Sequence, residues 1–234
     1  MSIKLCYNFF MDVLNSIKAD ENCADYMRFY NLLSSENKKY NLTSIEGEED
    51  FLIKHIADCI AFSDLYDDRA KIVEIGSGGG FPSVPLKIKR KDLDMTLIDS
   101  NEKKVAFLEN VKRFFGFENF NCICGRAEEL SKGALRESFD YAIARAVAPM
   151  NVLCELLLPF VKTGGKMMAY KGKNYKEELS LAENAIDKLG GRIKKICDYD
   201  LGTQGDRAII VVEKITSTPD IYPRRYAKIK KSTL

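Results

Sequence analysis

The chain has a single histidine, and none of its seven cysteines belongs to a Cys-x-x-Cys pair. Zinc sites are built from closely spaced Cys and His ligands, so we expect no metal site and free thiols in a reducing compartment. The N-terminus lacks a basic segment followed by an uninterrupted apolar core, which argues against a signal peptide. No apolar run approaches the roughly 18 residues of a membrane-spanning helix. These absences predict a cytoplasmic protein without metal or membrane attachment.

Positive charge is scarce in the first part of the chain and abundant later. Residues 1–70 hold 13 acidic and 7 basic side chains, whereas residues 71–234 hold 21 acidic and 29 basic ones. From Pro223 to the C-terminus there are five basic residues and no acidic one. This asymmetry indicates a polyanionic partner for the later part, although a solvated tail would account for the last residues equally well.

The hydrophobic pattern changes its period near residue 68. With 234 residues, 46% of them hydrophobic, the chain can form one large domain or one domain with an appendage. Helical spacing of apolar residues predicts a helical N-terminal extension over residues 1–68. Short apolar runs then alternate with segments of helix length. We expect strands at Ile72–Ile75, Met95–Ile98, Phe120–Ile123, Tyr141–Ala144, Lys166–Tyr170, Arg192–Tyr199 and Ala208–Val212.

This alternation is typical of βαβ units. It predicts an α/β fold with a doubly wound, mostly parallel, seven-stranded sheet whose last strands form an antiparallel edge. The sheet domain should span residues 69–216, followed by a basic C-terminal tail over 217–234. Ligands of such sheets bind beyond the carboxyl ends of the strands, so residues there are candidates for a site.

A glycine-dense turn follows the first expected strand, in the run Glu74-Ile75-Gly76-Ser77-Gly78-Gly79-Gly80-Phe81. Dinucleotide sites have the pattern G-x-G-x-x-G, and here Phe81 occupies the place of the third glycine. The acidic residue Glu74, two positions before the first glycine, can face an ammonium group. The pattern favours S-adenosylmethionine, with Glu74, Gly76 and Gly78 at the cofactor, although a tight strand-to-helix turn would read similarly.

A second acidic residue, Asp99, ends the next expected strand 23 residues after Gly76. That separation is close to the roughly 20 residues at which a carboxylate meets ribose hydroxyls in this kind of sheet. Both oxygens of a carboxylate accept hydrogen bonds, so Asp99 could hold both hydroxyls. A plain cap at the strand end is the structural alternative.

Further charged residues follow the third and fourth expected strands. Arg126 and Arg145 stand there, and with Glu74 and Asp99 they indicate one shared pocket. An arginine at position 145 could bind the cofactor carboxylate, an RNA phosphate or the O6 edge of a guanine, or could form a structural ion pair.

The chain resembles the bacterial small-subunit ribosomal RNA guanine-N7 methyltransferases, also called glucose-inhibited division protein B. The resemblance extends over nearly the full length of the chain. Its most specific part is the combination of three motifs: Phe-Pro-x-x-Pro after the glycines, Arg-Ala-Glu, and Arg-Ala-x-Ala. The matching segments are Tyr40-Asn41-Leu42-Thr43, Lys54-His55, Phe81-Pro82-Ser83-Val84-Pro85, Gly125-Arg126-Ala127-Glu128, Ala144-Arg145-Ala146, Tyr170-Lys171-Gly172 and Tyr222-Pro223-Arg224.

The resemblance implies a Rossmann-like methyltransferase fold, S-adenosylmethionine as cofactor and 16S ribosomal RNA as substrate. It carries the cofactor contacts onto Gly76, Phe81, Ala127, Glu128 and Arg145. Two departures are visible: Glu74 stands where the family usually has Asp, and the tail lacks the Gly and Pro that often follow the Pro-Arg pair.

Physical alternatives remain for several of these residues. The backbone at Ala127 can donate to an adenine ring and Glu128 can accept from its amine, or Glu128 can simply face a helix N-terminus. Phe81 can cover the methionine part of the cofactor or belong to the core. Guanine N7 carries a lone pair and no proton, so its methylation by direct displacement needs alignment rather than a general base. Arg145 is therefore the expected catalytic residue.

Candidate RNA contacts are scattered along the chain. Asn41, Thr43 and His55 match family motifs, although an isolated histidine is more often structural. Lys171 and Arg207 lie near loops by the expected pocket, and Arg224 and Arg225 begin the basic tail, where phosphate contacts give affinity without sequence information.

Other classes of function stay open from the sequence. The chain could methylate another RNA or a small nucleophile, or it could be a non-catalytic RNA-binding protein with a vestigial nucleotide pocket. A nicotinamide-dependent dehydrogenase is disfavoured by Phe81. We expect a monomer.

Overall fold

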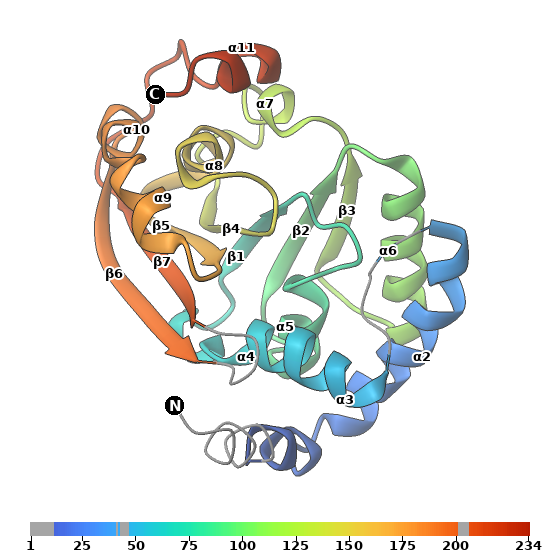
Figure 1. The fold of residues 1–234 in the computed structure, drawn as a ribbon. Helices are drawn as coiled ribbons and strands as arrows, with labels where there is room; N and C mark the ends of the chain where they lie inside the picture. Colours follow the sequence, from blue (N-terminus) through green and yellow to red (C-terminus); the bar gives the residue numbers. More distant parts are fainter. Residues whose placement is uncertain (1–11, 41, 43–46, 201–205) are drawn as a thin grey trace.

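The computed structural model describes residues 12–40, 42, 47–200 and 206–234. A seven-stranded sheet forms the centre of this described part, in the order β3-β2-β1-β4-β5-β7-β6 (Figure 1). The strands are β1 (Lys71–Ile75), β2 (Asp94–Asp99), β3 (Phe120–Cys124), β4 (Phe139–Arg145), β5 (Val161–Lys171), β6 (Gly191–Asp200) and β7 (Asp206–Lys214).

Strands β1 to β5 pair in parallel, and β7 runs antiparallel to both β5 and β6. All seven expected strands are confirmed, and each is longer than expected by one to six residues. The mostly parallel sheet with an antiparallel edge is confirmed as well. Strand order reverses between β1 and β4, and this is the place where doubly wound sheets bind ligands.

The sheet is buried on both faces. Successive side chains of each strand point to opposite sides, so each strand contributes to two hydrophobic clusters. In β4, Tyr141 and Ile143 join one hydrophobic cluster, and Ala142 and Ala144 join the other. The first cluster includes α5 (Ser83–Lys89), α6 (Glu102–Phe115) and the N-terminal helices. The second includes α8 (Met150–Leu157), α9 (Tyr175–Ser180), α10 (Glu183–Lys188) and α11 (Tyr226–Lys231).

The N-terminal extension is helical where it is described, as expected. Residues 12–18 are helical. They are followed by α2 (Cys23–Tyr40), α3 (Glu48–Phe51), the π-helix η1 (Leu52–Ala57), α4 (Asp58–Ile60) and the 3₁₀ turn η2 (Ser63–Leu65).

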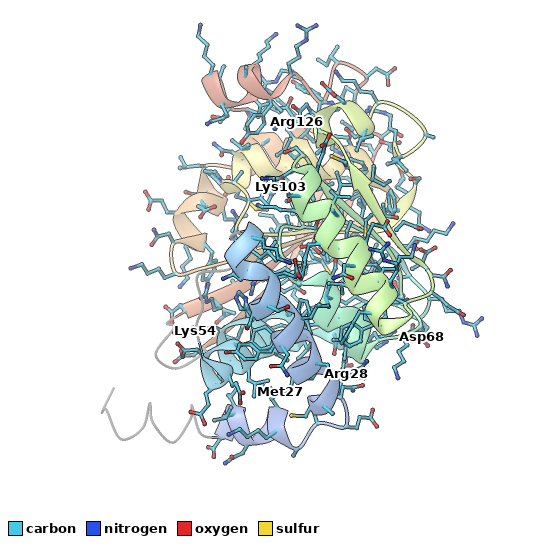
Figure 2. All side chains as sticks on the ribbon, turned by 90° about the vertical axis from the view of Figure 1, so that its right-hand side faces the viewer. Met27, Arg28, Lys54, Asp68, Lys103 and Arg126 are labelled. Carbon is cyan, nitrogen blue, oxygen red and sulfur yellow. The ribbon has the colours of Figure 1, made fainter. Side chains whose placement is uncertain are left out.

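Helix α2 runs beside α6 of the sheet domain (Figure 2). Its apolar residues Tyr26, Phe29 and Leu33 are buried. On its other side, the Arg28 guanidinium lies 5.0 Å from the centre of the Phe114 ring and 5.1 Å from that of Phe115. Apolar packing and cation–π contacts thus join the extension to the sheet domain.

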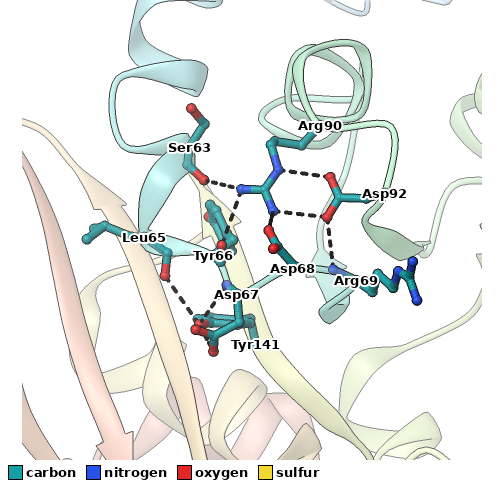
Figure 3. Close-up of polar contacts among 9 residues, drawn as sticks. All are labelled: Ser63, Leu65, Tyr66, Asp67, Asp68, Arg69, Arg90, Asp92 and Tyr141. Atoms are coloured by element: carbon teal, nitrogen blue, oxygen red, sulfur yellow. Dashed lines mark hydrogen bonds and ion pairs between the residues drawn. The ribbon is translucent and has the colours of Figure 1, made fainter.

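Arg90, just after α5, fastens the end of the extension to the sheet domain (Figure 3). Its guanidinium donates to the carbonyls of Ser63 and Tyr66 and to the carboxylates of Asp68 and Asp92. These contacts cross the predicted boundary at residue 68. The boundaries at residues 68 and 216 stay predictions.

The C-terminal segment packs as a short helix on the sheet domain. Helix α11 lies next to α7 (Ala127–Leu130) and α8 (Figure 1), and its Ile229 is fully buried. Just before it, Arg224 binds Glu155 of α8 through its backbone N–H, Nε and Nη2, at 2.6–3.2 Å. The Glu155 side chain is completely buried, so this ion pair anchors the segment.

The neighbours Arg224 and Arg225 offer a matched test of that anchor. Arg224→Ala leaves the buried Glu155 carboxylate without its partner, and we expect a loss of about 3 kcal/mol in the free energy of unfolding. Arg225 is exposed, so Arg225→Ala should change stability by less than about 0.5 kcal/mol. Urea denaturation measures both, and equal stabilities of the two variants would contradict the anchor.

Candidate active site

The glycine-dense turn leaves β1 at the switch point of the sheet. The Gly76 N–H donates to the Ile98 carbonyl at 2.8 Å, and its φ of 69° is in the left-handed region. A Cβ at Gly76 would lie only 2.7 Å from Cγ2 of Val147. Glycine is therefore required at this position by conformation and by space.

Asp99 ties the turn to the end of β2. One carboxylate oxygen accepts from the Gly78 N–H and the other from the Asn101 N–H, both at 2.9 Å. Gly78 itself has a positive φ of 54°. Asp99 thus acts as a structural cap, the alternative left open by the sequence, while the same side chain borders the cavity described next.

A first cavity of about 280 Å³ lies beyond the carboxyl ends of β1, β2 and β3. Four of the expected cofactor residues border it: Gly76, Asp99, Ala127 and Glu128. The other residues around it are Ile75, Ile98, Ser100, Lys104, Gly125, Arg126, Ala146, Val147, Leu156 and Tyr226.

Two side chains near the first cavity are held by one arginine. The Arg126 Nε lies 3.1 Å from the Glu128 carboxylate, and its guanidinium lies 4.7 Å from the centre of the Tyr226 ring. Glu128 also lies in the first turn of α7, where an acidic side chain interacts favourably with the helix N-terminus. The C-terminal segment therefore contributes to the wall of the cavity through Tyr226.

Glu74, on β1 two residues before Gly76, is a fully buried carboxylate and does not itself border the first cavity. Its Oε2 accepts from the Ser83 N–H at 3.1 Å, whereas its Oε1 has no hydrogen-bond partner among the described residues. Burial raises the pKa of Glu74 to about 8, against the opposing effects of the Ser83 hydrogen bonds and the Arg145 charge. An orphaned, buried carboxylate oxygen is suited to a ligand that brings an ammonium group.

Arg145, at the end of β4, is held by the N-terminal extension. Its guanidinium forms a 2.8 Å ion pair with Asp58 and donates to the Lys54 carbonyl and to Nδ1 of His55. Asp58 also accepts from the Tyr199 hydroxyl at 2.7 Å. Burial works against the Arg145 charge, but the neighbouring carboxylates, among them the hydrogen-bonded Asp58, raise the pKa of Arg145 above its ordinary value. Arg145 thus forms a structural ion pair, one of the roles that the sequence left open for it, and makes further hydrogen bonds as well.

Phe81 and His55 are stacked under this arginine. Their ring centres are 4.0 Å apart with a 12° angle between the planes, and the Arg145 guanidinium lies 5.1 Å from the Phe81 ring centre. Burial, assisted by the charges of Arg145 and Lys54, lowers the pKa of His55 to about 3. His55 is therefore neutral, and Phe81 packs in the core.

A second cavity, of about 330 Å³, adjoins the first at Ala146 and Val147. Arg145, Lys171 and Arg207, three of the residues expected from the sequence, border it. Ala146 has a positive φ of 57°, an uncommon backbone conformation for a residue with a Cβ. The other bordering residues are Asp58, Ala148, Pro149, Tyr170, Gly172 and Glu178.

The remaining expected RNA contacts are placed as follows. Arg225 is exposed beside Arg126 and Lys132. Arg224 faces Glu155 instead of solvent. Lys171 is buried, and its Nζ donates to the Ala148 carbonyl and the Glu178 carboxylate. Asn41 and Thr43 lie outside the described residues.

Sequence reasoning missed Asp58, Glu178 and Tyr226. Asp58 stands three residues after His55, so helical spacing put both on one face and could have indicated it. Glu178 and Tyr226 come from helices remote in sequence from the strand ends, and no local pattern marks them. In the described part of the chain no helix is long and apolar enough to span a membrane, and no cluster of His, Cys, Asp or Glu could hold a metal ion.

Comparison with known proteins gives the family. The family model GidB, described as rRNA small subunit methyltransferase G, matches residues 22–205. The chain belongs to this family. Curated relatives named ribosomal RNA small subunit methyltransferase G include one from Clostridium perfringens, 41% identical over 89% of both chains, and one from Brevibacillus brevis, 43% identical over 88% of both. The family expected from the sequence motifs is confirmed.

Solved structures support the fold. A SAM-dependent methyltransferase from Aquifex aeolicus matches with a TM-score of 0.51 at 16% identity, over 70% of this chain and 93% of the other. The [4+2]-cyclase SpnF matches with a TM-score of 0.54 at 14% identity, over 81% of this chain and 95% of the other. At such identities the likeness extends to the fold alone, and it confirms the Rossmann-like arrangement.

The residues present fit S-adenosylmethionine, the cofactor of this family of methyltransferases. The unpartnered Oε1 of Glu74 suits its ammonium group, and Asp99 stands at the first cavity with acceptor oxygens for ribose hydroxyls. Ala127 and Glu128 border the same cavity, where a backbone donor and a carboxylate suit an adenine edge.

Asp99→Ala tests the assignment of the ribose end. We expect S-adenosylmethionine binding to weaken by about 1.5–3 kcal/mol, the range of hydrogen bonds to a charged group. Stability should also fall, by about 1–2 kcal/mol, because the Gly78 and Asn101 N–H groups lose their acceptor. Asp94→Ala, at the opposite end of β2, is the control. Unchanged affinity by calorimetry would reduce Asp99 to a cap.

The Glu74→Gln variant tests whether the buried Glu74 side chain is protonated in the folded protein, through the dependence of stability on pH. The folded protein keeps a proton that the unfolded chain releases between about pH 4.5 and 8, so Glu74 makes the protein less stable as pH rises through that window. The facing charges of Arg145 and Asp99 remain in both proteins. His55 contributes an opposite slope only below pH 6.5.

The comparison is therefore made between pH 6.5 and 8. Denaturant unfolding should show wild-type stability falling relative to the Glu74→Gln variant across this interval. Parallel stability curves would mean that Glu74 is already ionised in the folded protein.

Proposed function

We propose that this chain transfers a methyl group from S-adenosylmethionine to N7 of a guanine in 16S ribosomal RNA. The observation that carries the proposal is the pair of cavities that adjoin at Ala146 and Val147, in a chain of the GidB family. One cavity has the groups for a nucleoside cofactor, and the other has three basic side chains at its border. Donor and acceptor would meet at the end of β4.

The cofactor, when bound, supplies an electrophilic methyl group on a sulfonium centre. Gly76, Asp99, Ala127 and Glu128, which border the first cavity, would hold it there. Glu74 and the turn at Gly78 stay expected contacts. Arg145 would orient the reacting groups from the second cavity, held by Asp58. Phe81 supports Arg145 through a cation–π contact.

Guanine N7 needs no deprotonation before it attacks, so alignment is the main task of the protein. Among the described residues at the second cavity, both carboxylates are in ion pairs: Asp58 pairs with Arg145 and Glu178 with Lys171. His55, nearby, is hydrogen-bonded to Arg145. This arrangement supports direct displacement without a general base.

Exposed basic side chains would contact the RNA backbone. Arg225 is the best-placed of the expected set, whereas Arg224 is engaged by Glu155. Asn41, Thr43 and His55 remain RNA-contact hypotheses from the family motifs. Because its substrate is ribosomal, we propose that the protein acts in the cytoplasm, as a monomer.

The direct experiment incubates the protein with methyl-labelled S-adenosylmethionine and small-subunit RNA or particles, then maps the label by N7-specific chain cleavage. We expect one labelled guanine. Label at another atom would contradict the proposal, and label in another RNA or a small molecule would support a different methyltransferase. RNA binding without label would indicate a non-catalytic RNA-binding protein.

Arg225→Ala tests the phosphate contact by salt dependence. The slope of log affinity against log salt should fall by about 0.7 for single-stranded RNA, while the methylation rate of the saturated complex stays the same. Arg192→Ala, which removes an exposed arginine paired with Glu213, is the control and should leave the slope unchanged. An unchanged slope for Arg225→Ala would remove this residue from the RNA surface.

A further inference from the structure

Two side chains of the second cavity have polar atoms that the protein itself leaves unused. The Arg207 side chain is half-buried, and its Nε is buried without a hydrogen-bond partner in the described part of the chain. Leaving a buried charged donor unpaired is costly, so the structure supports a ligand with an acceptor beside Arg207.

The other unused group is half of the Glu178 carboxylate. Its Oε2 accepts from the Lys171 Nζ at 2.6 Å and from the Met150 N–H at 2.9 Å. Its Oε1 has no donor among the described residues, and Glu178 borders the second cavity. Lys171 and the N-terminus of α8 thus fix the orientation of an acceptor that is available to a ligand.

A donor and an acceptor at one cavity distinguish between possible ligands. A phosphate group without a proton accepts only, so it could pair with Arg207 but would offer no donor to the Glu178 Oε1 at the same border. Guanine presents the acceptor O6 next to the donors N1–H and N2–H₂, which matches Arg207 and Glu178. Adenine has an amine in place of O6 and no donor at N1, so both contacts would fail.

We propose that the second cavity binds the target guanine itself, with Arg207 donating to O6 and Glu178 Oε1 accepting from the N1–H and N2–H₂ edge. The inference rests on the proposed function above and names the residues that select the base. N7 makes neither contact, so its lone pair stays available toward the first cavity. Glu178 and Arg207 are then specificity residues for guanine.

The test measures single-turnover methylation of small-subunit RNA that carries either guanosine or inosine at the mapped position. Inosine lacks the N2 amine and keeps N7, O6 and N1–H. Glu178→Gln should lower the rate on guanosine by roughly 10- to 150-fold, since an amide replaces part of a charged acceptor. On inosine the loss of methylation rate caused by Glu178→Gln should be at least about threefold smaller, because the contact from the N2 amine is already absent.

Arg207→Gln should lower the rate on both substrates by a similar factor, since both keep O6. The neighbour Glu177→Gln, at an exposed position, is the matched control and should behave like wild type. Calorimetry should show wild-type affinity for S-adenosylmethionine in all variants, within about twofold, which also establishes that they fold.

Three outcomes overturn the inference. The first is an equal loss of methylation rate on guanosine and on inosine for Glu178→Gln. The second is an Arg207→Gln variant that changes the salt slope of RNA binding but not the methylation rate. The third is a Glu178→Gln variant that methylates guanosine as fast as Glu177→Gln. If wild-type protein methylates no guanine N7 at all, the proposed function fails instead, and that result is visible before any variant is made.

Discussion

The site depends on the buried contact between Asp58 of the N-terminal extension and Arg145 at the end of β4. Asp58 is 5% and Arg145 15% exposed at the side chain, so neither charge would be tolerated there alone. The pair brings a helix that precedes the sheet in sequence against the switch point of the sheet. Through it, the extension determines the orientation of a guanidinium at the second cavity.

The neighbouring contacts extend this constraint in two directions. Tyr199 of β6 binds the second oxygen of Asp58, which links the antiparallel edge to the same pair. His55 and Phe81 stack beneath Arg145, which links it to the glycine-dense turn. This polar centre borders the second cavity, which meets the first at Ala146 and Val147, directly after Arg145.

Much of the fold followed from local patterns. The strands are buried runs separated by segments of helix length, so their number, order of appearance and antiparallel edge could be predicted. Gly76 and Asp99 were predictable because the turn and the strand end impose specific residues there. Ala127 and Glu128 were expected at the cofactor from the family resemblance, and they border the first cavity.

Partners in space could not be predicted in the same way. Nothing in the sequence near Arg224 indicates Glu155, 69 residues earlier, and a basic tail was expected where the structure has an anchored helix. Lys171 was a candidate RNA contact by its position after a strand, but its Nζ is directed to Glu178 and Ala148. Only the folded arrangement decides which charges meet each other and which face a ligand.

The most direct measurement is a double-mutant cycle of Asp58→Asn and Arg145→Lys on the single-turnover rate of methyl transfer to small-subunit RNA. If the pair orients the reacting groups as a unit, the double variant should be little slower than the worse single variant, with a coupling free energy of about 1–3 kcal/mol. Independent, additive effects of the two substitutions would contradict the account.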